Sequence, residues 1–578
     1  MDLSMDALYG IIFAPFVRRS GAHTLSEWLE MRFDSKTRTL ITITTILGLL
    51  GIMANNVVSM AIVVTGFTGW SLVATLSVIF FMFLIFTYIG GFWAVTLTDF
   101  IQMCIGLIAL PALIISIVIK YGGLDFASSK WPGDFGFSTH GISNGQMPLF
   151  SIEYPSILTF IILFACFLVW GNNYYWLRVS SVRSERTAKL SFIFGAVLLL
   201  IPIVVLAFVG VYAGAIFPDA FAPHGEASPM SAFGVVLKAV PISIAAFALI
   251  GALSASISTS TTALIGASST AMRDLYQRFV KPNATPKELT FPSKMITLIL
   301  GLLVWLLCFY PGGPLYLFAF STAWLGPPSL LVLLGIWWKR TTTKGAFYGT
   351  VVGISVTVIF TLLGLFKIFI IDQYTHVGVV GLVATLVTIV VVSLLTKPSY
   401  YAEPGWKSDK VAMQKQSIEV SNIERKILKD IYLGYNTMAE ISDLLGTDSS
   451  VSNTLIEDLD KKYLINREKY TGPGFYTFEI TSKGMEYVDL NEQELQIAPD
   501  QVSVEDLKFL QLVQQGPHIL QQYLIQHEYD SLKASAILSK LIKQNYLKEY
   551  GMWRRKVSIT ENGRIIVNKH QILLESVF

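Results

Sequence analysis

Long apolar runs recur along the first two thirds of the chain and then stop. Most are about 17–25 residues or longer, the length that an α-helix needs to cross a hydrocarbon core of roughly 30 Å. The pattern therefore predicts an all-α polytopic membrane protein with about eleven spans. The expected spans lie near 5–18, 40–66, 71–93, 97–119, 155–172, 190–217, 237–268, 293–310, 315–337, 345–371 and 375–396.

The loops between these runs indicate the orientation. Loops rich in Lys and Arg alternate with loops poor in both, and by the positive-inside rule the basic loops are cytoplasmic. The tail after Lys397 is then cytoplasmic as well, and we expect a multi-pass protein of the plasma membrane. The basic groups are Arg18, Arg19, Arg32, Lys36 and Arg38; Arg178, Arg183, Arg186 and Lys189; Arg273, Arg278, Lys281 and Lys287; and Lys339, Arg340 and Lys344.

Composition separates two parts of the chain. Of 578 residues, 53% are hydrophobic and 14% charged, and the mean hydropathy is +0.56, which excludes a soluble protein of this length. From residue 401 onward there are 21 Lys and Arg against 25 Asp and Glu, whereas the preceding part has 22 against 15. We therefore expect a basic transmembrane domain over 1–398 and an acidic tail.

The tail repeats one order of elements. After a polar linker over 399–422, residues 423–490 and 501–570 each show helical stretches followed by a turn and a strand. Three helices and a short hairpin resemble the winged-helix fold, here in tandem, so the tail is predicted to be α+β. Such folds often bind DNA through the third helix and the hairpin.

Charge argues against nucleic acid as the partner of the tail. The third helix of the first repeat carries Glu457, Asp458 and Asp460, which repel phosphate. In the second repeat, several basic residues could bind an anion, so this alternative is kept. The tail is instead expected to bind protein, either itself or the cytoplasmic loops, where Arg183 and Arg186 would meet Glu457 and Asp460. The basic residues of the second repeat that could bind an anion are Lys533, Lys540, Lys543, Arg554, Arg555 and Lys556.

Hydroxyl groups are concentrated in the span that contains residues 254–270, with ten Ser and Thr side chains. Ala255, Ser258 and Thr259 are spaced i, i+3 and i+4 and share one helix face. Neutral oxygens converging from such a face are ligands for a hard cation such as Na⁺. Alternatively, these small residues allow close helix packing, with hydroxyls bonding back to their own helix.

Asp99 stands near the start of another span, one turn before Gln102. A carboxylate at membrane depth is costly and usually functional. Near the interface it can equally cap its helix, and both interpretations stay open. The three cysteines, Cys104, Cys166 and Cys308, fall inside spans and indicate no disulfide framework.

Four segments together resemble the sodium:solute symporter family, which includes proline, pantothenate and sugar symporters. The resemblance covers roughly residues 5–396 and does not reach the tail. These segments are Thr24-Leu-Ser-Glu-Trp-Leu-Glu-Met-Arg-Phe, Gly90-Gly-Phe-Trp-Ala-Val-Thr-Leu-Thr-Asp-Phe-Ile-Gln, the hydroxyl-rich helix ending Arg273-Asp-Leu-Tyr, and Trp337-Trp-Lys-Arg-Thr-Thr-Thr-Lys-Gly-Ala-Phe-Tyr-Gly.

The resemblance implies a leucine-transporter-type bundle of two inverted five-helix repeats, with ion and solute near the membrane midplane. It implies Na⁺ ligation by the Ala255 carbonyl, Ser258 and Thr259, and a place for Asp99 on the cation route. It implies that Trp170, Asn173 and Trp324 line the substrate cavity, although packing or an interfacial belt explains the tryptophans as well. Family members usually have two further spans before the point where this chain begins, so we expect the sequence to be incomplete at its start.

The sequence therefore predicts secondary active transport, the Na⁺-coupled symport of a small organic solute into the cell by alternating access. The alternative is a membrane sensor that binds solute and signals through the tail. No phosphate-binding loop, kinase motif or Cys/His cluster indicates an enzyme. We expect Na⁺ as coupling ion, no organic cofactor and no other metal, and solute, lipid and protein as partners.

Overall fold

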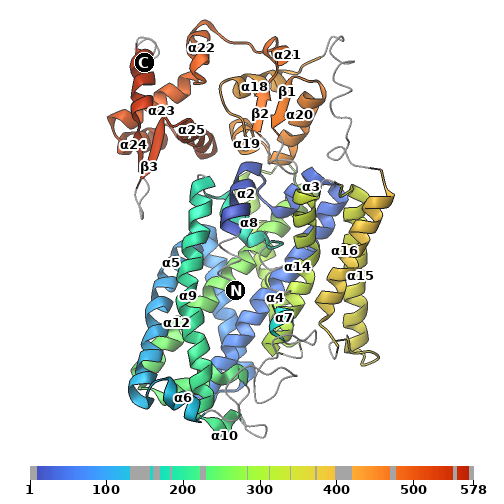
Figure 1. The fold of residues 1–578 in the computed structure, drawn as a ribbon, viewed down its shortest axis with the longest axis vertical. Helices are drawn as coiled ribbons and strands as arrows, with labels where there is room; N and C mark the ends of the chain where they lie inside the picture. Colours follow the sequence, from blue (N-terminus) through green and yellow to red (C-terminus); the bar gives the residue numbers. More distant parts are fainter. Residues whose placement is uncertain are drawn as a thin grey trace.

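The computed structural model describes residues 9–130, 156–160, 170–182, 185–221, 229–282, 284–310, 313–338, 340–371, 374–397, 419–468, 477–550 and 556–571. Long helices form a bundle, and the tail lies beyond one end of it (Figure 1). The bundle helices are α2 (Ala14–Ser20), α3 (Leu25–Arg32), α4 (Ser35–Thr68), α5 (Leu72–Tyr121), α6 (Leu124–Lys130), α7 (Ile157–Phe160), α8 (Asn173–Ser180), α9 (Glu185–Ile216), α10 (Pro218–Phe221), α11 (Ala232–Val236), α12 (Ile242–Ala271), α13 (Pro286–Leu307), α14 (Gly313–Trp337), α15 (Thr343–Leu365) and α16 (Val377–Leu395).

Nine helical segments within the described residues are long and apolar enough to cross a membrane, and each coincides with a predicted span. The label α5 covers two of them, because Gly91 has a φ of +61° and interrupts the helix between Leu72–Gly91 and Ala94–Tyr121. The hydroxyl-rich span runs on from α12 through the π-helical turn η5 (Met272–Gln277).

Two predicted spans have no counterpart among these nine. Near 5–18, the described part is the π-helical turn η1 (Tyr9–Phe13) followed by α2. Its twelve residues reach about 18 Å at 1.5 Å per residue, which is shorter than a span. Most of the predicted span 155–172 lies outside the described residues.

Close packing of small residues holds the long helices together. Gly251 of α12 faces Ala109 of α5, and a Cβ added at Gly251 would lie 2.7 Å from the Cβ of Ala109. Gly48 of α4 meets Leu325 of α14 in the same way, at 2.6 Å. Without hydrophobic driving force between helices in lipid, such close approach supplies the van der Waals contact that stabilises the bundle.

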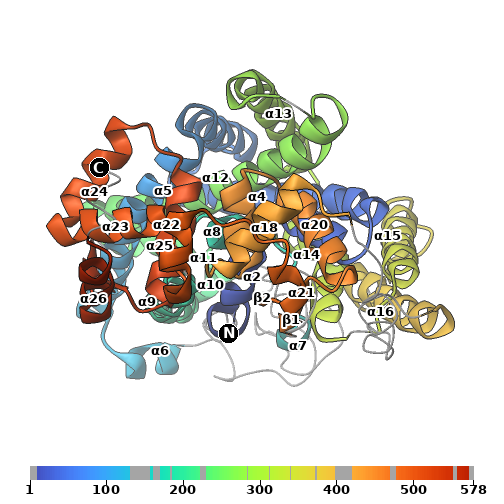
Figure 2. The same ribbon diagram turned by 90° about the horizontal axis from the view of Figure 1, so that it is seen from above.

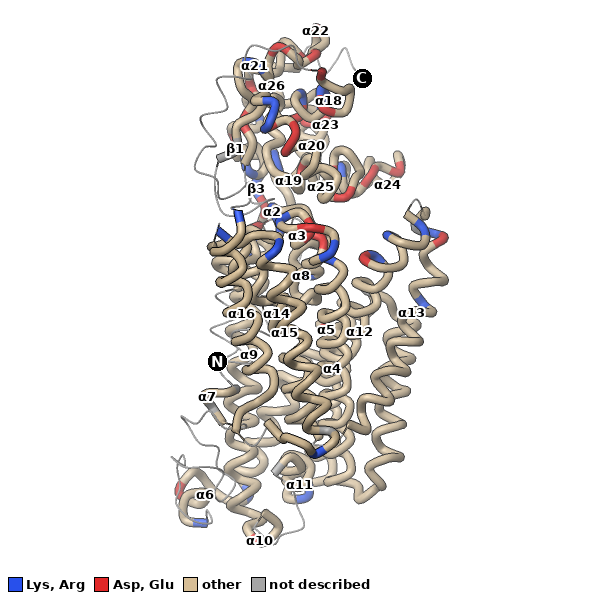
Figure 3. The backbone as a smooth tube through the Cα atoms, turned by 90° about the vertical axis from the view of Figure 1, so that its right-hand side faces the viewer, with Lys and Arg blue, Asp and Glu red and all other residues tan. Residues whose placement is uncertain are grey.

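The loops predicted to lie on one side do meet one another. Arg19 forms an ion pair with Glu185 at 2.8 Å, and Arg38 pairs with Asp274, so the basic groups before α4, before α9 and after α12 share one end of the bundle. Charged residues gather at this end and are sparse along the middle of the bundle (Figure 3). We refer to it below as the tail end.

The tail shows the predicted order of elements twice. An isolated bridge pairs Thr437 with Thr477 in the first repeat. The first repeat has α18 (Asn422–Tyr432), α19 (Met438–Leu445), α20 (Ser449–Lys461), β1 (Ile465–Glu468), the antiparallel β2 (Thr477–Ile480) and α21 (Ser482–Met485). After α22 (Glu492–Ile497), the second has α23 (Val504–Gln515), α24 (Pro517–Gln526), α25 (Ser531–Lys543), β3 (Leu547–Tyr550), the antiparallel β4 (Lys556–Ile559) and α26 (Glu561–Lys569).

The third helix of the second repeat packs against the first repeat. Lys540 of α25 is fully buried and pairs with Asp506, whose other oxygen accepts the hydroxyl of Tyr435 at 2.6 Å. Lys543 donates to Glu440 of α19 at 3.0 Å. Two of the lysines that could have met an anion are thus used within the tail. Seen from above, the tail leaves α13, α15 and α16 uncovered (Figure 2).

Candidate functional site

The three predicted sodium ligands lie near the middle of α12. Ala255 is exposed, and Ser258 and Thr259 are half-buried, in the part of the chain that the structure describes. The Thr259 hydroxyl donates to the Ala255 carbonyl at 3.2 Å, a bond back to its own helix. Such a bond uses the hydroxyl proton and leaves oxygen lone pairs for a cation. The geometry is therefore compatible both with ion binding and with simple helix packing.

Asp99 reaches the same helix. Its Oδ2 accepts a hydrogen bond from Arg178 of α8 at 2.7 Å and one from the hydroxyl of Thr262 on α12 at 3.4 Å, and Arg178 also donates to Thr262 at 2.8 Å. The Asp99 side chain is 12% exposed. Its Oδ1 is buried and has no hydrogen-bond partner among the described residues.

Asp99 and the hydroxyl-rich face thus form one constellation. Thr262 follows Ser258 by four residues and Thr259 by three, so it lies on the adjacent turn of the same face. A shallow pocket beside this turn is lined by Val95, Thr96, Tyr174, Leu177, Arg178, Thr262, Ile265 and Gly266. Oxygen donors of this kind, one of them anionic, suit a hard monovalent or divalent cation.

The structure places Asn173 at a junction between three elements. Its Oδ1 accepts the backbone N–H of Leu25 at 2.8 Å, and its Nδ2 donates to Thr270 of α12 at 2.6 Å. The side chain is fully buried. Asn173 therefore joins the starts of α3 and α8 to the end of α12, and its role in the substrate cavity stays a prediction.

The two tryptophans have different aromatic neighbours. Trp170 is 9% exposed and packs against Phe13 and Tyr9, with ring centroids 5.2 and 5.8 Å away, and against Trp337 at 6.2 Å. Trp324 of α14 is half-buried beside Phe320, at 6.1 Å. Of the residues predicted from the sequence, the structure brings Asp99 to the hydroxyl-rich helix. That Trp170, Asn173 and Trp324 line one cavity stays a prediction.

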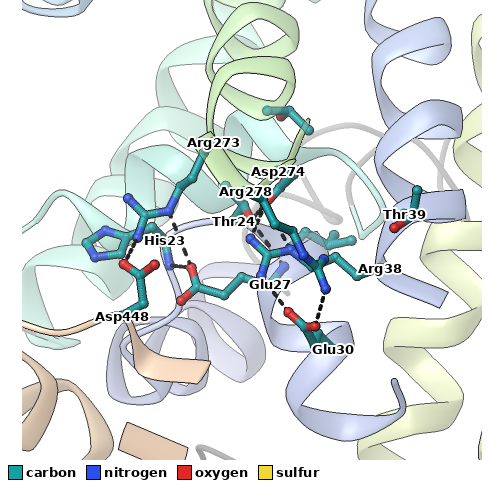
Figure 4. Close-up of polar contacts among 12 residues, drawn as sticks. His23, Thr24, Glu27, Glu30, Arg38, Thr39, Arg273, Asp274, Arg278 and Asp448 are labelled. Atoms are coloured by element: carbon teal, nitrogen blue, oxygen red, sulfur yellow. Dashed lines mark hydrogen bonds and ion pairs between the residues drawn. The ribbon is translucent and has the colours of Figure 1, made fainter. Parts of the chain in front are cut away.

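A charged network at the tail end of α12 was not predicted from the sequence (Figure 4). Asp274 is fully buried and accepts hydrogen bonds from Thr24 at 3.2 Å and from Arg38, whose Nε lies 3.1 Å from Oδ1. Arg38 also donates to Glu30 at 2.5 Å, and Glu30 accepts from Arg278 at the same distance. These bonds fasten the end of α12 to α3 and to the start of α4.

Glu27 is the second buried carboxylate of this network. It accepts the backbone N–H of His23 at 3.0 Å and the hydroxyl of Ser449, from the tail, at 2.9 Å. Burial by itself raises the pKa of Glu27, but Arg273, 3.7 Å away, and His23 outweigh it, so the pKa lies below its ordinary value. Burial, reinforced by Arg273, lowers the pKa of His23. Near neutral pH, an anionic Glu27 therefore faces a neutral imidazole.

One local signal pointed to Glu27. Thr24-Leu-Ser-Glu27 has the spacing of a capping box, and Thr24 does accept the backbone N–H of Glu27 at 3.1 Å at the start of α3. The partners Asp274, Arg38 and Ser449 come from distant parts of the sequence. No spacing rule connects them, which is why only the fold shows the network.

Comparison with known proteins agrees with this architecture. A solved Na⁺-coupled sialic acid symporter in a substrate-bound, outward-open state aligns with a TM-score of 0.54 and 21% identity, over 69% of this chain and 83% of that one, and this likeness shows the fold alone. The sodium/pantothenate symporter of Haemophilus influenzae is 27% identical over 391 residues, 67% of this chain and 78% of the relative. The sodium/proline symporter of Escherichia coli is 27% identical over 401 residues, 65% of this chain and 74% of the relative.

These relatives are transporters, so the predicted transport function is confirmed at the level of the family, and the sensor alternative finds no support in them. The family model described as the sodium:solute symporter family matches residues 3–353, more than half of the chain. The chain therefore belongs to the sodium:solute symporter family.

Proposed function

We propose that this protein imports a small organic solute across the plasma membrane, driven by Na⁺ moving down its gradient. Ala255, through its carbonyl, and the hydroxyls of Ser258 and Thr259 are the proposed sodium ligands on α12. Asp99 is the proposed acidic group on the route of the ion. The tail faces the cytoplasm in this proposal, on the side of the basic loops.

The observation that carries the proposal is the hydrogen-bonded group of Asp99, Thr262 and Arg178. It joins a nearly buried carboxylate to the turn next to the proposed ligands. Burying a carboxylate in a membrane protein is costly unless a cation balances it. Arg178 provides that balance in the structure, and 46% of its side chain is exposed.

The same geometry suggests how an ion passes. Na⁺ arriving at Asp99 competes with the guanidinium of Arg178 for Oδ2 and finds Oδ1 without a partner among the described residues. Thr262 then offers a neutral oxygen one turn from Ser258 and Thr259. A neutral oxygen set holds Na⁺ weakly enough to release it, which a coupling ion requires.

The solute follows from the relatives only as a class. They are named for pantothenate, proline, glucose and myo-inositol, and the solved neighbour for sialic acid. We propose a small polar organic molecule of this range, with Trp170, Asn173 and Trp324 as the proposed cavity residues. The tail is proposed to be a tandem winged-helix-like module, over 423–490 and 501–570, that binds protein rather than nucleic acid.

A transport assay tests the proposal directly. The full chain is reconstituted in proteoliposomes, and uptake of radiolabelled proline, pantothenate, myo-inositol, glucose and sialic acid is followed with an inward Na⁺ gradient. We expect accumulation of one of them above the equilibrium level. Collapsing the gradient with a sodium ionophore, or replacing Na⁺ by K⁺, should abolish it. Uptake that persists unchanged in K⁺ would contradict sodium coupling.

A further inference from the structure

The first tail repeat touches the bundle through a surface that is built for contact. Arg273, after α12, pairs with Asp448 (Figure 4). Glu27 of α3 accepts a hydrogen bond from the hydroxyl of Ser449 at 2.9 Å. Arg18 of α2 lies 3.8 Å from Asp443 of α19. Both partners in that last pair are largely buried, at 12% and 14% exposure.

The Asp448 side chain binds Arg273 and does not cap the helix that it begins. It is the N-cap residue of α20, where an Asp side chain usually accepts a hydrogen bond from its own helix. No such capping bond forms, and the carboxylate bonds to Arg273 instead. The next residue, Ser449, gives its hydroxyl to a carboxylate that is fully buried. The side chains at the start of α20 thus bind residues of the bundle.

Backbone contact makes the interface tight. Gly21 is the C-cap of α2 and has a φ of +72°. A Cβ added there would lie 2.9 Å from the Cα of Ala439 in α19, closer than such atoms approach. Only glycine adopts this conformation without strain and also lets α19 of the tail approach the backbone at this position.

Two consecutive residues of η5, the turn that continues α12, therefore face two different partners. Asp274 is bound to Thr24 and Arg38 within the bundle, and Arg273 is bound to Asp448 of the tail and lies beside Glu27. Arg273 follows Thr259 by fourteen residues, about 21 Å along the helix. The tail is thus attached to the very helix that carries the proposed sodium ligands.

We propose that the first tail repeat is a clamp that restrains the transporter, with Asp448 and Ser449 holding Arg273 and Glu27 and so fixing the end of α12 against α3. The proposal rests on the transport function proposed above. Docking stabilises the conformation in which these four residues meet. Any step of the transport cycle that separates the ends of α12 and α3 must first break the contacts with the tail, so the clamp slows transport.

The variant Asp448→Ala with Ser449→Ala tests the clamp in the full chain. It removes the ion pair and the hydrogen bond to Glu27 and leaves the bundle sequence intact. Hydrogen bonds to charged groups stabilise the docked tail, and losing them should lower the equilibrium constant for docking roughly tenfold. In hydrogen–deuterium exchange, we expect faster exchange at the start of α20, in α3 and in η5. Unchanged exchange in α3 and η5 would overturn the proposal.

Two matched controls separate undocking from helix damage. Asn491→Ala removes the N-cap of α22, an exposed tail helix, and should leave exchange in α3 and η5 unchanged. Gly21→Ala should release the tail by steric clash. Gly69→Ala is its control, because Gly69 has a similar left-handed conformation, at φ +75°, and a Cβ added there meets nothing within 4 Å. This variant should leave the tail docked. Equal effects of the two glycine variants would contradict docking at Gly21.

Transport gives the second readout. With the labelled solute that the wild-type chain accumulates, the Asp448→Ala and Ser449→Ala variant should show an initial rate several-fold higher. A rate that is equal or lower, with the tail released by the exchange measurement, would overturn the restraint. If the wild-type chain accumulates none of the five solutes, the transport proposal fails, and the exchange measurements still decide whether the tail holds α12.

Discussion

Asp274 accepts two hydrogen bonds from the guanidinium of Arg38, and this buried ion pair ties the end of the hydroxyl-rich helix to the start of α4. The Asp274 side chain is completely inaccessible and that of Arg38 is 7% exposed. Arg38 has a second anionic partner, Glu30, whereas its guanidinium is the ion-pair partner of Asp274. Removing Asp274 therefore leaves the largely buried Arg38 with one counter-charge in place of two.

Replacing Asp274 by alanine should destabilise the protein severely. Breaking a buried pair by removing one partner costs about 3–5 kcal/mol when the remaining charge is left uncompensated, and Glu30 offsets part of that cost for Arg38. We expect Asp274→Ala to lower the midpoint of heat-induced aggregation of the purified chain and its abundance in membranes. Asp125→Ala, in the exposed first turn of α6, is the control and should leave both unchanged. Wild-type thermal stability of the Asp274 variant would show that Glu30 alone is enough to balance the charge of Arg38.

Removing the proposed ligand hydroxyls should weaken sodium binding. In Ser258→Ala with Thr259→Ala, two oxygens are lost at a half-buried site, and we expect the half-saturating Na⁺ concentration to rise roughly tenfold, equivalent to about 1.4 kcal/mol. Binding of ²²Na⁺ to the purified chain measures this without knowledge of the solute. Ser268→Ala with Ser269→Ala, farther along the same helix, is the matched control. If both double variants bind Na⁺ like the wild type, the hydroxyls serve packing alone.

The tail should become more stable as the pH falls from 7 towards 4, through Asp430. Burial raises the pKa of this carboxyl to about 6, and the nearby Lys426 and Lys429 offset only part of that rise. The folded tail therefore binds a proton more tightly than the unfolded chain, whose Asp has a pKa near 3.9. Stability from this group is complete below the unfolded pKa and is lost as the pH rises through about 6.

Urea unfolding of the fragment 420–578, which we expect to fold by itself, measures this effect. Asp430→Asn should stabilise the fragment at pH 7 by on the order of 2 kcal/mol and flatten its pH dependence. Asp489→Asn, at a side chain that is 80% exposed, should do neither. An Asp430→Asn fragment that is less stable at pH 7 would mean that the carboxylate is needed in its charged form.

The same fragment should bind DNA only weakly. The first repeat presents an acidic third helix, and in the second Lys540 is buried with Asp506 while Lys533 pairs with Glu505. We expect dissociation constants in the salt-sensitive, non-specific range of roughly 10⁻⁴–10⁻⁶ M. Fluorescence anisotropy at physiological salt with unrelated duplexes measures this. Tight binding that depends on the DNA sequence would overturn the assignment of a protein-binding tail.

The structure shows contacts between the tail and the bundle that charge alone did not predict. Arg183 lies outside the described residues, and Arg186 is exposed. Among the described residues, the tail meets the bundle through Asp443, Asp448 and Ser449, and the expected contact of Arg183 and Arg186 with Glu457 and Asp460 stays a prediction. Net charge predicted contact between the acidic tail and the basic loops. Which residues pair depends on which helix ends lie opposite the tail, and this is set by the fold.

The sequence by itself determined nine spans, each of which coincides with an apolar helix among the described residues, and the order of helices and hairpin that occurs twice in the tail. A helix in lipid satisfies its backbone internally and needs only a long apolar run, so each span is a local property that the pattern of residues shows directly. The same holds for the hydroxyl-rich face, because i, i+3 and i+4 positions align in any α-helix.

Only the tertiary structure decided which polar groups meet. Asp99 and Thr262 are 163 residues apart, and Glu27 and Ser449 are 422 apart, yet each pair is within hydrogen-bond distance. Such pairings depend on the relative rotation and depth of packed helices, to which every contact in the bundle contributes. For the same reason, only the structure shows that Asn173 lies between Leu25 and Thr270, where it accepts the backbone N–H of the first and donates to the hydroxyl of the second.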